Sequence, residues 1–216
     1  MIFIGVMGLF LSACGNESDH AKAMETTPKT ASRTFVYECN DGYSFTARIE
    51  GEKAWLFLPG STISLPHVKA ASGVKYSDDT ALFWSKGNEA LLEIDDSKYR
   101  CKNNRKQAIW EASKLDGNDF RATGNEPGWH LQIREGNKIE YVGDYGSTLY
   151  HFSDASYFTD QKARKTTYQA SDGKHKLTLV LEGRLCRDSM SDDTYETTVM
   201  LIIDGKTLHG CGKALH

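Results

Sequence analysis

Short apolar segments recur at regular intervals from residue 35 to residue 101, with turn-forming residues between them. No window of helical length in this region shows a 3.6-residue period of apolar positions. Regularly spaced short strands joined by tight turns are typical of a small antiparallel sandwich or barrel. The pattern therefore predicts eight strands within residues 33–105. The apolar segments are 35–39, 43–49, 54–58, 63–68, 74–76, 81–84, 90–94 and 99–101.

A second β-rich region follows a change of composition. Residues 102–119 are basic and then mixed, and 107–114 fit a short helix, so residues 106–118 are interpreted as a linker. Beyond them the alternation of apolar and polar positions returns, most clearly in "KLTLVLE". The chain is thus predicted to be all-β, with a second domain over 119–216. Its expected strands are 129–135, 138–144, 147–153, 176–183, 195–203 and 206–212.

The N-terminus predicts an exported, lipid-anchored protein. "MIFIGVMGLFLSAC" is an apolar run too short to span a bilayer and typical of a secretory signal. Its end, "LSAC", resembles the bacterial lipobox, in which Cys14 receives the lipid. Residues 1–13 would be the signal peptide and 14–32 a flexible tether. Gly15 after the cysteine indicates the outer membrane. The protein is therefore expected to carry acyl chains (palmitate), to be anchored by them in the outer membrane and to face the periplasm.

The remaining cysteines predict two disulfide bonds. The chain has 5 cysteines, and removing lipidated Cys14 leaves four in an oxidising compartment. Four cysteines allow three connectivities. We expect Cys39–Cys101 and Cys186–Cys211, because each of these pairs lies within one predicted domain. The first pair would tie the first strand of the N-terminal domain to the last, as a closed barrel requires. Each bridge should contribute roughly 3–4 kcal/mol on the loop-entropy model.

Composition and spacing argue against several functions. A formal net charge of −3 provides no basic patch for nucleic acid. The 7 histidines are scattered without metal-ligand spacing, so neither a metal nor another cofactor is expected. Glu126, Asp144 and Asp154 sit at the ends of predicted strands and give only a weak hypothesis of a glycosidase pair. Trp84 is interpreted as a core residue.

Three motifs and two cysteines resemble a known family. "YECNDGYSFTARI", "LPHVKAASGVKYS" and "LFWSKGNEALLEI", followed by "YRC", are similar in order and spacing to the membrane-bound and periplasmic inhibitors of c-type lysozyme. The similarity covers residues 35–101. It implies a compact antiparallel barrel with a disulfide bond, and a binding protein rather than an enzyme. It also implies c-type lysozyme as the partner, with a serine of the Ser-Gly-x-x-Tyr motif and a lysine of the Trp-x-Lys-Gly motif entering its active-site cleft.

On this sequence the resemblance selects Ser72, Gly73, Tyr76, Lys86 and Gly87 as lysozyme-binding residues. Lysozyme cuts with two carboxyl groups, one protonated and one ionised. The Lys86 ammonium would bind the ionised one, while the Ser72 hydroxyl can both accept and donate a hydrogen bond. The two glycines permit the tight turns that project these side chains. Tyr76 and the following turn, 77–79, are expected to widen the contact.

The C-terminal region resembles an uncharacterised bacterial envelope domain over about residues 119–212. Glu126 and Trp129 match its Gly-x-Glu-Pro-x-Trp motif, and Asp188 and Met190 match its Cys-x-Asp-x-Met-Ser motif. A structural role is favoured for these residues. The alternative to lysozyme inhibition is an envelope structural or ligand-binding lipoprotein whose C-terminal domain carries the main role. A hydrolase that uses Glu126 is a third reading.

Overall fold

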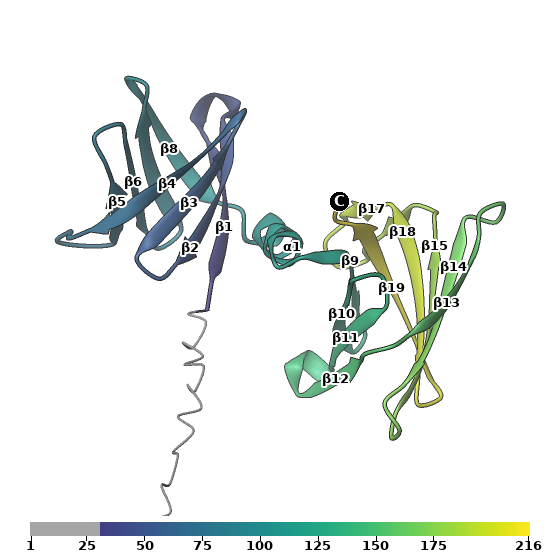
Figure 1. The fold of residues 1–216 in the computed structure, drawn as a ribbon. Coiled ribbons are helices and arrows are strands. Elements are labelled where there is room, and N and C mark those ends of the chain that lie inside the picture. Colours follow the sequence, from purple (N-terminus) through teal and green to yellow (C-terminus); the bar gives the residue numbers. More distant parts are fainter. Residues whose placement is uncertain (1–30) are drawn as a thin grey trace, which may run out of the picture. The chain divides into compact units, whose positions relative to one another are not determined.

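The structure is a computed structural model that describes residues 31–216, which form one unit by their contacts. Its strands make a closed barrel, a separate nine-stranded sheet and a small two-stranded sheet (Figure 1). The predicted signal peptide, Cys14 and nearly all of the predicted tether lie outside the described residues. No helix among residues 31–216 is long and apolar enough to cross a membrane.

The first eight strands close into an antiparallel barrel, as predicted from the spacing of the apolar segments. Each strand pairs with its sequence neighbour, and β1 also pairs with β8, which removes the free edges of the sheet. A short 3-10 turn, η1 (Asn40–Gly42), separates the first two strands. The barrel strands are β1 (Arg33–Cys39), β2 (Ser44–Glu50), β3 (Lys53–Leu58), β4 (Ser61–Val68), β5 (Val74–Ser77), β6 (Ala81–Lys86), β7 (Glu89–Ile94) and β8 (Ser97–Asn103).

Alternating inward side chains fill the barrel. Tyr37, Leu56, Leu65, Phe83 and Leu92 are all 0 % exposed, and they come from five different strands. This arrangement follows from the two-residue period of a strand, which directs every second side chain to one face. The barrel therefore has its own hydrophobic core.

The predicted disulfide bond closes the barrel seam. Cys39 of β1 lies opposite Cys101 of β8, and the two form a disulfide with a Cα–Cα distance of 3.8 Å. The second predicted bridge, Cys186–Cys211, is present as well. Both pairings confirm the assignment of one bridge to each β region.

A single α-helix follows the barrel. α1 (Arg105–Leu115) begins at Asn104, whose side chain accepts a hydrogen bond from the backbone N–H of Gln107 at 3.1 Å. Such a cap satisfies one of the free N–H groups of the first turn. Trp110, a residue of this helix, is buried. The helix predicted for residues 107–114 is thus confirmed and is longer at both ends.

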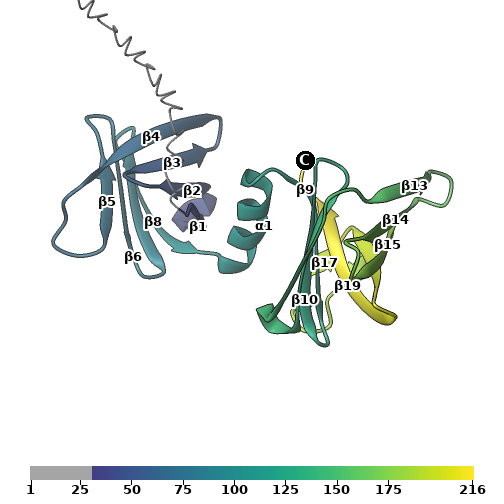
Figure 2. The same cartoon turned by 60° about the horizontal axis from the view of Figure 1, so that its bottom comes forward.

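The C-terminal region forms a strongly curled antiparallel sheet of nine strands (Figure 2). Its strand order is β12-β11-β10-β9-β19-β18-β15-β14-β13. Leu131, Ile133, Leu179, Val199 and Leu201 are central to its own core. The strands are β9 (Asn118–Asn125), β10 (Gly128–Arg134), β11 (Lys138–Gly143), β12 (Thr148–Phe152), β13 (Ser156–Asp160), β14 (Lys165–Ser171), β15 (Lys176–Glu182), β18 (Thr197–Ile203) and β19 (Lys206–Ala214).

Two smaller elements complete this region. The 3-10 turn η2 (Asp144–Gly146) connects β11 to β12, and β16 (Cys186–Arg187) pairs with β17 (Thr194–Tyr195). The sequence pattern missed β9, β13, β14 and the two-residue β16. All of β13 is exposed and β14 is rich in threonine, so neither strand shows the apolar alternation of a half-buried strand.

The buried phenol of Tyr37 makes the stability of the barrel sensitive to alkaline pH. Burial raises the pKa of Tyr37 from 10.0 to about 12 and outweighs the smaller opposing effects of Ser85 and Arg33. The folded state therefore favours the neutral phenol. Stability should be fully present below pH 10 and fall by roughly 2–3 kcal/mol as the pH rises from 10 to 12. Urea unfolding across this range is expected to show a smaller loss in Tyr37→Phe, and an identical loss would contradict the assignment.

Candidate functional site

The two turns selected by the sequence motifs lie at the same end of the barrel. Strands β5 and β6 are antiparallel, with Val74 opposite Ser85. Extending this register by one position places Gly73, which precedes β5, beside Lys86, which ends β6. The Cβ position of Gly73 would lie 3.2 Å from the Cβ atom of Lys86. The structure thus brings the predicted serine turn and the predicted lysine turn into contact.

Gly73 is required where the serine turn meets β6. Its φ is +70°, in the left-handed region that side chains with a Cβ rarely adopt. A Cβ atom there would lie 2.4 Å from the carbonyl oxygen of Ser85. Close approach of the two backbones therefore demands a residue without a side chain. Ser72, next to it, is exposed to solvent.

The lysine is presented by a two-residue turn. Lys86 pairs with Glu89 across β6 and β7, and Gly87 and Asn88 make the connection. Gly87 has a φ of +62°, as the first central position of the favoured hairpin turns requires. The Lys86 side chain is exposed and takes part in none of the ion pairs found within residues 31–216. Its ammonium group is therefore available to a partner.

Trp84 does not lie in the core as the sequence interpretation had it. Its side chain is 38 % exposed, because it points outward between the inward-facing Phe83 and the partly buried Ser85. The indole Nε1–H donates a hydrogen bond to the carbonyl oxygen of Ser72 at 2.8 Å. The sequence pattern left the orientation of this residue open, because Phe83 and Trp84 are aromatic residues at successive positions of one strand.

Tyr76 and the turn after it occupy other places than the sequence suggested. Tyr76 is 3 % exposed and stacks on Phe83 with a ring-centroid distance of 6.1 Å, so it lies in the barrel core beneath the surface. The 77–79 turn follows the far end of β5, about 10 Å along the strand from Val74, the first strand residue after the serine turn. There Asp78 accepts backbone hydrogen bonds from Thr80 and Ala81, which lower the pKa of its carboxyl group. The structure thus places neither feature beside the serine and lysine turns.

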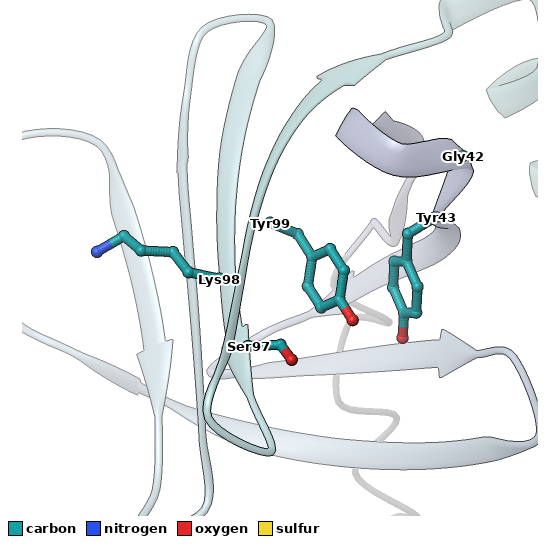
Figure 3. A pocket seen from close by; sticks show the side chains of 5 residues that line it. All are labelled: Gly42, Tyr43, Ser97, Lys98 and Tyr99. Atoms are coloured by element: carbon teal, nitrogen blue, oxygen red, sulfur yellow. The ribbon is translucent and has the colours of Figure 1, made fainter.

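Lys86 borders a hollow on the outside of the barrel. Trp84, Glu89 and Arg100 are also among its lining residues, and its volume is about 860 Å³. A second hollow of about 530 Å³ lies beside Tyr43 and Tyr99 (Figure 3). Their rings stack with a centroid distance of 4.2 Å. This second hollow contains neither the serine nor the lysine of the motifs.

The two C-terminal motifs meet at one place in the curled sheet. Asn125 donates from Nδ2 to Asp188 Oδ1 at 2.8 Å, and the backbone N–H groups of Met190 and Ser191 donate to the same oxygen. Asp188 is 9 % exposed. Burial raises the pKa of its carboxyl group, but these hydrogen bonds outweigh burial and hold the pKa below its usual value. Asp188 therefore acts as an ionised anchor for the 188–193 turn.

Trp129 of the first C-terminal motif is a core residue. It is 3 % exposed and lies against the glycines of two neighbouring strands. A Cβ atom at Gly124 would be 2.2 Å from Trp129 Nε1, and one at Gly210 would be 2.7 Å from the Trp129 ring. The favoured structural role of Trp129 agrees with this packing. Met190, in contrast, is 75 % exposed.

The suggested carboxylate pair for hydrolysis is not assembled around Glu126. Glu126 lines a hollow of about 380 Å³ together with Asp188 and His209, and neither Asp144 nor Asp154 contributes to that lining. The geometry therefore gives no support to the glycosidase hypothesis built on these three carboxylates.

Fold and site together define a class of protein: a small disulfide-bonded antiparallel barrel that presents an exposed serine and an exposed lysine on adjacent turns. Comparison with known proteins gives a family match for one segment of the chain. Residues 37–100 match the family model described as "Membrane-bound lysozyme-inhibitor of c-type lysozyme". The resemblance recognised from the sequence motifs is thereby confirmed for this segment.

Individual relatives carry the same description. A membrane-bound lysozyme inhibitor of C-type lysozyme from Yersinia enterocolitica is 45% identical over 65 residues, which cover 29% of this chain and 55% of the relative. This chain thus spans about half the length of that protein. One from Pseudomonas aeruginosa is 28% identical over 106 residues, covering 44% of this chain and 84% of the relative. A solved structure described as the crystal structure of Pseudomonas aeruginosa MliC in complex with hen egg white lysozyme also matches, at 25% sequence identity. The match covers 46% of this chain and 99% of that chain, with a TM-score of 0.30.

Alanine at the two site glycines should have unequal effects. Gly87→Ala places a Cβ atom in open space and carries only the conformational cost of its φ, about 1–2 kcal/mol. Gly73→Ala carries a similar cost and also forces the serine turn away from Ser85. Amide chemical shifts of Ser85 and Lys86 should therefore change more in Gly73→Ala. Equal changes in both variants would contradict the close packing of the two turns.

Alanine at Gly124 should destabilise the C-terminal sheet by roughly 1–3 kcal/mol, because the added methyl group overlaps Trp129 and the backbone oxygen of His209. Gly183→Ala is the matched control, since the three atoms nearest to its Cβ atom would belong to the side chain of Arg164, at 3.1 Å or more. Urea denaturation followed by tryptophan fluorescence measures both. Equal stability of the two variants would show that the glycine is not needed for Trp129.

Proposed function

We propose that this protein is a lipid-anchored inhibitor of c-type lysozyme that inserts the serine and lysine turns into the active-site cleft of lysozyme. One observation carries the proposal. Within the segment that matches the family model, residues 37–100, Ser72 and Lys86 are exposed on turns that contact each other. The membrane-bound lysozyme inhibitors of Yersinia enterocolitica and Pseudomonas aeruginosa support the same function.

The chemistry of the two side chains suits a cleft that holds two carboxyl groups. The Lys86 ammonium group forms a charge-assisted hydrogen bond with the ionised carboxylate of lysozyme. The Ser72 hydroxyl accepts a hydrogen bond from the protonated acid and donates one to a neighbouring oxygen. Since both lysozyme groups then have partners, neither can act on a glycosidic bond. The inhibitor itself carries out no reaction.

Location makes the inhibition effective. Lipid attached to Cys14 would hold the barrel at the outer membrane, facing the periplasm, with residues 15–32 as tether. An anchored inhibitor has a high effective concentration near its attachment point. Lysozyme reaching the peptidoglycan would meet the inhibitor there, and the cell wall would be protected from hydrolysis.

Lysis of a lysozyme-sensitive cell suspension tests the proposal. The oxidised protein should prevent clearing by a c-type lysozyme. Lys86→Ala should weaken inhibition by about 100-fold, because a carboxylate in the cleft loses its charge partner. Ser72→Ala should weaken it by about tenfold, as expected for one hydrogen bond to a charged or polar group.

Lys174→Ala is the matched control, because this exposed lysine lies in the turn between β14 and β15 of the C-terminal region and its loss changes the net charge equally. It should inhibit as well as the parent. Unchanged lysis in a large molar excess of folded parent protein would reject the proposed function.

A second candidate function rests on the C-terminal region. Residues 104–216 lie outside the segment that matches the family model, and the hollow beside Glu126 and Asp188 is formed where the two C-terminal motifs meet. An envelope structural or ligand-binding lipoprotein would use this region. Rejection of lysozyme inhibition would make this the leading function.

A further inference from the structure

We propose that Trp84 is a positioning residue for lysozyme inhibition: its indole holds the Ser72–Gly73 turn against the Lys86 turn, so that both side chains reach the cleft as one preassembled unit. The inference rests on the proposed function and adds to it a residue that touches neither lysozyme carboxyl group. The serine turn is accordingly expected to be ordered in the free protein as well.

The connection between β4 and β5 has little else to hold it. All five of its residues, 69–73, are exposed, and they belong to no strand or helix. Apart from the ladders between strands, one hydrogen bond within residues 31–216 reaches this connection, and it is the bond from Trp84 Nε1 to the Ser72 carbonyl oxygen. An exposed connection with so few contacts is ordinarily mobile.

Gly73 of the serine turn packs against three consecutive residues of β6: Trp84, Ser85 and Lys86. A Cβ atom on Gly73 would lie 2.4 Å from Ser85 O, 2.9 Å from Trp84 Nε1 and 3.2 Å from Lys86 Cβ. The turn therefore rests directly on the strand that ends at Lys86. With the indole bonded to the carbonyl group of Ser72, the positions of Ser72 and Lys86 are fixed relative to each other.

Order in the free protein increases affinity. A partner binds only the fraction of molecules whose turn is already in the binding conformation, and the apparent dissociation constant rises as this fraction falls. Rigidifying a binding loop reduces the entropy lost on association. Removal of the indole N–H should therefore weaken inhibition although it removes no contact with the lysozyme carboxyl groups.

A packing role alone does not account for Trp84. The core of the barrel is built without it, and the side chain is 38 % exposed. Trp55 on β3 is a close counterpart, because it is 37 % exposed on the same kind of outward-facing strand position. The hydrogen bonds of residues 31–216 include none from the Trp55 indole. Phenylalanine at both positions keeps an aromatic ring and removes the indole N–H group.

The test compares Trp84→Phe and Trp55→Phe for inhibition of lysozyme and combines each with Ser72→Ala. We expect Trp84→Phe to weaken inhibition by about tenfold and Trp55→Phe to leave it within about twofold of the parent. In the Trp84→Phe background, Ser72→Ala should cost much less than it does in the parent, because the serine is no longer held in place. Equal losses for the two tryptophan variants, or additive effects of Trp84→Phe and Ser72→Ala, would overturn the proposal.

Nuclear magnetic resonance of the free protein decides the inference independently of lysozyme. The indole N–H of Trp84 should exchange with solvent more slowly than that of Trp55, and the amides of Ser72 and Gly73 should show the order of the neighbouring strands. Trp84→Phe should make these two amides mobile while the β1–β8 ladder is unchanged.

If the parent fails to inhibit lysozyme, the proposed function is wrong, and order lost in Trp84→Phe still supports the positioning role. Rapid indole exchange or a mobile turn in the parent would overturn that role even if the parent inhibits.

Discussion

The pairing of β5 with β6 is the constraint on which the candidate site depends. Val74 lies opposite Ser85, so the residues just outside this pair, Gly73 and Lys86, must be neighbours. Ladder hydrogen bonds fix this register, and a shift by one residue would turn Phe83 out of the core and Trp84 into it. The buried Tyr76 and Phe83 hold the register from inside the barrel. A core interaction thereby determines the distance between two surface side chains that are fourteen positions apart in the sequence.

Closure of the barrel between β1 and β8 stabilises the sheet in which β5 and β6 pair. The Cys39–Cys101 bridge joins the first and last strands, and their pairing leaves no free edge. Small barrels have limited cores, so a covalent bond between the seam strands is a large part of their stability. A rigid barrel can then present short turns whose own contacts are few. Stability comes from the core and the seam, while the turns at one end carry the residues proposed for recognition.

Much of the fold could be predicted from the sequence, because half-buried strands carry a visible alternation. All eight barrel strands and both disulfide bonds were predicted, and the helix at residues 107–114 was recognised. Strand β13 was missed because all of it is exposed, and β14 was missed because its sequence, KTTYQAS, shows no regular apolar alternation. The motifs selected Ser72 and Lys86, which are exposed on adjacent turns, but the outward position of Trp84 and the burial of Tyr76 were not predicted. Both depend on which face of a strand points inward, and short strands with aromatic residues at successive positions leave this open.

Titration of isotope-labelled protein with unlabelled c-type lysozyme, followed through the backbone amide signals, tests the central claim most directly. Lysozyme should broaden or shift the signals of residues 69–74 and 84–88 first and most strongly, with those of the C-terminal sheet unchanged. Changes confined to the C-terminal sheet, or no changes at saturating lysozyme, would contradict the account.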